Sequence, residues 1–135
     1  MKQRPMLTLD DCRKISAAAE AEAKKNNWPV AIAVVDSTGH LVAFEKIDNT
    51  QYASVGIAQG KAMTALNFRR PTKALEDGIA GGGAALRILA VRGVTPLEGG
   101  INIEVDGKIV GAIGVSGVLS SQDAMVAKAG ADGLK

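Results

Sequence analysis

The sequence predicts an α+β fold in which helices flank an antiparallel sheet of about five strands. Two observations support this prediction. Short apolar runs occur as two pairs, each joined by a turn signal, so the paired strands should form antiparallel hairpins. Runs with apolar residues at helical spacing lie before, between and after these pairs, and such helices bury their apolar faces against a sheet. The 135 residues contain no linker, so residues 1–135 are expected to form a single domain.

The first helix is expected to begin after Thr8, which together with Asp11 resembles a capping box. It should end near Asn26, because Pro29 disfavours α geometry in the residue before it, Trp28. Its inward face is expected to carry Leu9, Cys12, Ile15, Ala19 and Ala23.

A first hairpin should follow. Residues 30–35 are apolar and rich in β-branched side chains, which favours a short buried strand over a helix. Residues 36–39 have turn composition, and residues 40–47 form the expected return strand.

The second helix is predicted over residues 51–67. Its basic end, Arg69 and Arg70, suits the negative end of the helix dipole, and Pro71 interrupts it. Its expected core stripe consists of Tyr52, Val55, Ala58, Ala62 and Ala65.

Glycines dominate the segment that follows. Residues 72–77 predict only one or two helical turns, and Gly78 with the glycines at 81–83 predicts a flexible hinge. Residues 84–90 predict a short helix. Residues 93–100 predict a loop or an irregular edge strand, because Pro96 has no N–H to donate to a neighbouring strand.

The C-terminal hairpin carries the strongest turn signal, Asp106-Gly107 between two apolar runs. One face of its second strand carries only the small residues Ala112, Gly114 and Ser116. Such a face requires a close neighbour, which could be a packed helix, another subunit or a ligand. We place the expected ligand pocket between this face and the neighbouring helices. A final helix should be capped by Ser120 or Ser121. Its inward face is expected to carry Ala124, Ala127, Ala131 and Leu134.

Composition excludes several classes of function. A net charge of +2, without a basic run or an aromatic platform, argues against nucleic-acid binding. The single cysteine, Cys12, fits a reducing compartment. The N-terminus lacks the apolar core of a signal peptide, and no apolar run is long enough to span a bilayer. We therefore expect a cytoplasmic protein that has no membrane partner.

Several residues are candidates for a site, each with a plainer alternative. His40, the only histidine, could be a general base or an iron ligand, or simply a strand residue beside a turn. Lys61 and Arg69 could bind a carboxylate, or could belong to a solvated helix end. The backbone around Gly114 could hold an anion, although tight packing explains the same glycines. Ser116 lies one residue short of a nucleophile elbow, so it supports a serine–histidine triad only weakly.

Three segments taken together resemble the GlcG/HbpS family, a haem-binding-like group that includes the C-terminal domain of the PduO adenosyltransferases. The segments are PVAIAVVDSTGHLVAFEKID (29–48), KAMTALNFRRPTKAL (61–75) and EGGINIEVDGKIVGAIGVSGVLSSQD (98–123). The resemblance implies a profilin-like fold assembled into symmetric homo-oligomers, often octamers. It also implies a small-molecule ligand, because relatives bind haem or iron, sometimes with haem breakdown, and others accompany glycolate or diol metabolism.

The resemblance leads to three hypotheses. In the first, the protein binds haem or a related tetrapyrrole, with His40 as the iron ligand and Lys61 and Arg69 at the propionates. In the second, it is an enzyme that acts on a small hydroxy- or oxo-carboxylate. Arg69 would then hold the carboxylate, the amides of Gly99 and Gly100 would hold an oxyanion, and His40 or Asp123 would move the proton. In the third, it is a structural or regulatory module of an oligomer.

Overall fold

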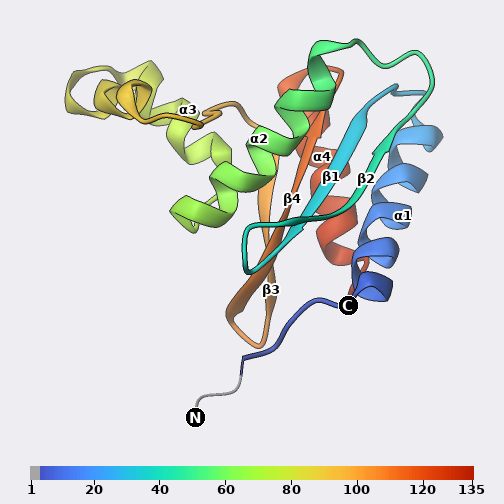
Figure 1. Cartoon of the computed structure of the whole chain (residues 1–135). Helices are drawn as coiled ribbons and strands as arrows, with labels where there is room; N and C mark the ends of the chain where they lie inside the picture. The colour runs from blue at the N-terminus through green and yellow to red at the C-terminus, as the bar shows by residue number, and fades with distance from the viewer. Residues whose placement is uncertain (1–3) are drawn as a thin grey trace.

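The structure, a computed structural model, describes residues 4–135 and is built around an antiparallel sheet (Figure 1). In this part of the chain the sheet has four strands in the order β2-β1-β4-β3. The strands are β1 (Ala31–Asp36), β2 (Leu41–Lys46), β3 (Gly100–Val105) and β4 (Lys108–Ser116). Helices α1 (Leu9–Lys25) and α4 (Ser120–Asp132) pack on one face, and α2 (Ala53–Phe68) packs on the other. Between α2 and β3 lie α3 (Thr72–Gly81) and the 3-10 helix η1 (Gly83–Ala90).

The sheet has one strand fewer than expected, because residues 93–99 form a loop. Two amides in this loop bond to side chains instead of to a neighbouring strand. The Thr95 N–H donates to Thr64 Oγ1 at 2.9 Å, and the Glu98 N–H donates to Glu76 Oε1 at 3.4 Å. Pro96 has no N–H. The α+β class and the antiparallel hairpins are confirmed, and the fifth strand is wrong.

The first helix agrees closely with its prediction. Thr8 and Asp11 form the capping box, with the Thr8 N–H donating to Asp11 Oδ2 at 2.9 Å and the Asp11 N–H donating to Thr8 Oγ1 at 3.1 Å. Cys12, Ile15, Ala19 and Ala23 are fully buried. Leu9 is the exception: it is exposed.

The two faces of the sheet have different packing. The face toward α1 and α4 is filled by branched aliphatic side chains, including Ile32, Ile113 and Val115. The contact between the other face and α2 is built mainly from alanines, with Ala33 and Ala112 on the sheet and Ala58 on the helix. At its centre, a Cβ on Gly114 would lie 2.0 Å from the Ala58 carbonyl oxygen. Helix α2 therefore occupies the small-residue face and is the close neighbour that this face requires.

The helices after the first hairpin differ from the predictions at their ends. Tyr52 precedes α2 and is 93% exposed, so it is not part of the core stripe. Helix α3 continues through Gly78 and ends at Gly81, and the break falls at Gly82 and Gly83, whose φ angles are +71° and +68°. The hinge is therefore shorter than expected.

The last helix is not capped by a serine. Its N-cap is Leu119, whose N–H donates to Gln122 Oε1 at 3.3 Å, and Ser120 is already the first helical residue. Its buried face carries Asp123, Val126, Ala127 and Gly130, while Ala124, Ala131 and Leu134 are only half-buried. Within residues 4–135, no helix combines the length and the apolar character needed to cross a lipid bilayer.

Candidate functional site

One polar cluster, the Lys61–Asp123 pair, is sealed inside the protein. Lys61 Nζ donates to the Val115 carbonyl oxygen at 2.8 Å and to Asp123 Oδ2 at 3.1 Å. The two side chains are 2% and 3% exposed, respectively. Asp123 Oδ1 accepts from the Val118 N–H at 3.1 Å. Burial raises the pKa of Asp123, and the nearby Lys61 charge offsets only part of this effect. The pair joins α2 to β4 and α4 and does not line any of the cavities described below.

Gly99 lies directly against this pair. A Cβ on Gly99 would lie 2.7 Å from Lys61 Nζ and 2.7 Å from the Val115 carbonyl oxygen. Its φ of +132° also favours glycine. Gly99 thus lies between the buried Lys61 ammonium and a surface groove that it also lines.

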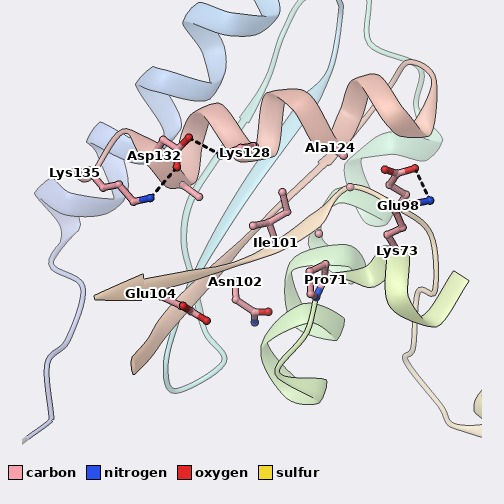
Figure 2. Close-up of a pocket in the computed structure, with 13 residues that line it drawn as sticks. Pro71, Lys73, Glu98, Ile101, Asn102, Glu104, Ala124, Lys128, Asp132 and Lys135 are labelled. Carbon is pink, nitrogen blue, oxygen red and sulfur yellow. Dashed lines mark hydrogen bonds and ion pairs between the residues drawn. The ribbon is translucent and has the colours of Figure 1, made fainter. Parts of the chain in front are cut away.

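This groove, which we call the β3–α4 groove, has a volume of about 370 Å³ (Figure 2). It lies along β3, beneath α4 and next to the start of α3. Its apolar lining is Pro71, Ile101, Ala124 and Ala131. Gly99 and Gly100 lie at one end, but the Gly100 N–H already donates to Thr72 Oγ1 at 2.9 Å. That amide is therefore not free to hold an oxyanion.

The charged side chains around the β3–α4 groove largely neutralise one another. Lys73 Nζ lies 3.9 Å from Glu98 Oε1. At the other end, Asp132 receives both Lys128, at 3.0 Å, and Lys135, at 3.2 Å (Figure 2). The lysines of the groove therefore do not form a concentrated positive charge for an anionic ligand.

A second polar cluster, the turn between β1 and β2, is open to solvent. Thr38 Oγ1 donates to Asp36 Oδ1, because an ionised carboxylate can only accept. His40 Nδ1 lies 2.8 Å from the same hydroxyl. Since the hydroxyl hydrogen already points to Asp36, Nδ1 must carry a proton and donate it to Thr38. In the neutral imidazole, Nε2 then holds the free lone pair, as required of a metal ligand or a general base.

We call the hydrogen-bonded residues Asp36, Thr38 and His40 the relay. Asp36 is held in the ionised form that accepts the Thr38 hydroxyl hydrogen. Burial alone would raise the pKa of Asp36, but hydrogen bonds from the Thr38 hydroxyl and from the Thr38 and His40 N–H groups lower it overall. The Thr38 N–H donates to Asp36 Oδ1 at 2.9 Å. An ionised Asp36 at neutral pH therefore fixes the Thr38 hydroxyl, and the hydroxyl fixes the His40 ring.

The turn lies against the C-terminal end of α2. A Cβ on Gly39 would lie 3.4 Å from Met63 Cε and 3.9 Å from Leu66 Cδ2. Arg69 follows three residues after Leu66, is exposed, and takes the left-handed conformation at φ 55°. We call this region, made of His40, Met63, Leu66 and Arg69, the His40 surface. The turn brings an oriented imidazole to the end of α2 that carries two partly buried apolar side chains, and Arg69 directly follows this helix.

The structure separates the remaining candidates from this surface. Gly114 and Ser116 are buried beneath α2, and Ser116 Oγ hydrogen-bonds Ser54 Oγ at 3.1 Å. Lys61 is on α2 but points inward to Asp123. The predicted ligand-binding set is thus divided among the sealed pair, the β3–α4 groove and the His40 surface.

Sequence reasoning did not identify Asp36 and Thr38 as partners of His40. The signal was present, because an aspartate two residues before a threonine is typical of a side-chain-bonded turn. Among residues 4–135, no three His, Cys, Asp or Glu side chains lie together as ligands for a metal ion. A metal at the His40 surface would therefore have to bring further ligands of its own, as haem iron does.

Residues 7–132 match the family described as "Haem degrading protein HbpS-like". Protein GlcG of Escherichia coli strain K12 is 44% identical over 116 residues, which cover 86% of this chain and 85% of GlcG.

Two solved structures are also similar. A double mutant of HbpS from Streptomyces reticuli is 32% identical with a TM-score of 0.89, covering 98% of this chain and 89% of that one. A structure described as a PduOC:Heme complex is 25% identical with a TM-score of 0.86, covering 96% of this chain and 95% of that one.

Proposed function

Because this chain belongs to the HbpS-like family of haem degrading proteins, we propose that it binds haem or a related tetrapyrrole at the His40 surface. The similar PduOC structure contains haem, which supports this class of ligand. The observation that carries the location is the Asp36–Thr38–His40 relay, which holds the only histidine with Nε2 free.

The residues of the His40 surface fit such a group. His40 Nε2 would coordinate the iron, and the haem would supply the redox-active metal. Met63 and Leu66 would contact the apolar macrocycle, and Arg69 would pair with a propionate. Lys61, the other expected propionate partner, is sealed in its pair with Asp123, so this role falls to Arg69.

The proposal includes self-association into a homo-oligomer, which the resemblance had suggested with an octamer as the common form. One His40 surface covers only one side of a flat tetrapyrrole. A second copy would shield more of the ligand from water, which a binding site for a large apolar group requires.

Titration of the purified protein with hemin, followed by absorption spectroscopy, tests the proposal. We expect a saturable Soret shift that His40→Ala abolishes. Arg69→Ala should weaken binding, whereas Arg70→Ala should not, because the Arg70 Nε already donates to the Phe68 carbonyl oxygen at 3.0 Å. An unchanged spectrum in His40→Ala would refute the assignment.

The same relay favours one second candidate, an enzyme that acts on a small hydroxy- or oxo-carboxylate. An imidazole oriented by a hydroxyl and a carboxylate is also suited to act as a general base, and Arg69 would hold the substrate carboxylate. Neither Asp123 nor the glycines at 99 and 100 belong to this surface, so the chemistry would depend on His40 and Arg69. A thermal-shift screen separates the two functions. A rise in Tm with a small acid, lost in Arg69→Ala, and no Soret shift with hemin would favour the enzyme.

A further inference from the structure

The segment after α3 carries an apolar surface that no other part of residues 4–135 covers. We call residues 83–92, which comprise η1, Val91 and Arg92, the arm. Leu86, Leu89 and Val91 are 45%, 63% and 48% exposed, and η1 contains no buried residue. Figure 1 shows this segment projecting from the sheet beyond α3. Eight residues are long for a 3-10 helix, and such a helix gains most of its stability from packing.

The β3–α4 groove is the matching feature. Its centre is apolar, formed by Ile101, Ala124 and Ala131, and no residue of the arm lines the groove of its own chain. Pro71 and Lys73 at the start of α3 line the groove (Figure 2), and the arm follows the other end of this helix. The arm is therefore joined to the edge of the groove through a single helix, α3.

Charge supports the match. Arg87 and Arg92 are the only charged residues of the arm, and neither forms an ion pair within the described chain. Glu104 lines the groove, is exposed, and is the one acidic side chain there without a lysine partner in residues 4–135. The arm, which is apolar and basic, is therefore complementary to the β3–α4 groove, which is apolar and carries the Glu104 carboxylate.

We propose that the arm of one copy docks in the β3–α4 groove of a second copy, and that the exchange is reciprocal. The proposal rests on the self-association proposed above and names the surface that mediates it. Because each chain carries one arm and one groove, a two-fold axis between two copies satisfies both arms at once. Leu86 and Leu89 would then leave water, and Arg87 or Arg92 would meet Glu104 of the other copy. No residue of the His40 surface lines this groove, so this contact between copies and the coordination of the ligand use different side chains.

Disulfide trapping tests the docking directly. The only natural cysteine, Cys12, is buried, and burial raises the pKa of its thiol to about 11, so it should not interfere. A chain carrying both Leu89→Cys and Lys128→Cys should form a covalent dimer under mild oxidation, seen on a non-reducing gel. The matched control carries Leu119→Cys with Lys128→Cys, because Leu119 is 67% exposed but lies outside the arm. Equal dimer in both chains, or none in the first, would overturn the proposal.

Sedimentation velocity supplies an independent measurement. The unmodified chain should sediment as a dimer or a larger assembly, and Leu89→Glu should shift it to a smaller species. Leu119→Glu should leave the distribution unchanged. A monomeric unmodified chain, or an unaffected Leu89→Glu variant, would contradict the docking. Neither measurement uses hemin, and His40→Ala should cross-link normally, so failure of ligand binding and failure of docking are distinguishable.

Discussion

The two polar clusters of this protein, Lys61–Asp123 and Asp36–Thr38–His40, have opposite relations to water. The first is almost completely buried and has its donors and acceptors satisfied by β4 and the loop after it. The second ends on an exposed ring with one nitrogen free. A buried charge pair joins elements at a high desolvation cost, whereas an exposed, oriented group can meet a ligand. The comparison teaches that residue type alone does not mark a site; accessibility and orientation do.

The largest effect should come from breaking the sealed pair. Lys61→Met leaves the Asp123 carboxylate buried without its counter-charge, and we expect a loss of about 3–5 kcal/mol in the free energy of unfolding. Urea denaturation measures this loss. The double variant Lys61→Met with Asp123→Leu should recover most of it, because no unpaired charge remains. A single variant within about 1 kcal/mol of the parent protein would show that the pair is not structurally important.

A smaller effect, on binding rather than stability, should come from the open relay. Thr38→Val removes the hydroxyl that orients His40, and loss of such a supporting hydrogen bond weakens ligation by about 10–100-fold. Hemin titration measures this change in Kd, and unfolding should be nearly unaffected because Thr38 is exposed. Ser37→Ala, at the neighbouring exposed position, is the matched control. Equal affinity in the two variants would exclude the relay from ligand binding.

A third cluster, Glu20 and Glu45, lies between these extremes and sharpens the comparison. Glu45 extends from β2 toward α1, and its Oε1 is buried without a hydrogen-bond partner among residues 4–135. Burial, and then the hydrogen bond and charge of Glu20, raise the pKa of Glu45 from 4.5 to about 7. The charged groups facing this pair are Arg13 and Lys24 from α1 and Lys46 and Asp48 from the β2 side.

A carboxyl group whose pKa is raised on folding increases the free energy of unfolding at low pH relative to high pH. The contribution of Glu45 should be fully present below pH 4.5 and should be lost as the pH rises toward about 7. Because Glu45 is partly exposed, solvent screening limits the change to about 1 kcal/mol. Unfolding measured across this range should show a flatter pH dependence for Glu45→Gln than for the parent. Glu104→Gln removes one exposed carboxylate and is the control; identical slopes for all three proteins would contradict the prediction.

Local signals predicted most of the fold. The capping box at Thr8, the Asp106-Gly107 turn and the apolar runs each depend on residues close in sequence, and each was found where expected. The fifth strand failed because the amides of Thr95 and Glu98 bond to side chains more than twenty residues away. No local pattern contains that information.

The site was predicted less completely for the same reason. Small residues on a strand indicate close packing, but Gly114 could not show whether a helix or a ligand was the neighbour. The β3–α4 groove was missed because Ile101 and Ala124 come together only through the fold. His40 was identified by composition alone, and its orientation became apparent only with the hydrogen bonds of Thr38.

The left-handed conformation at Arg69 bears on which residue type suits this helix end. Helices commonly end on a glycine in this conformation, since a side chain there costs about 1 kcal/mol. Here the position is occupied by an exposed arginine. A designer optimising thermostability alone would substitute glycine and obtain a firmer but less charged molecule. Under the proposed function, Arg69 therefore exchanges some stability at the helix end for a charge that can meet the ligand.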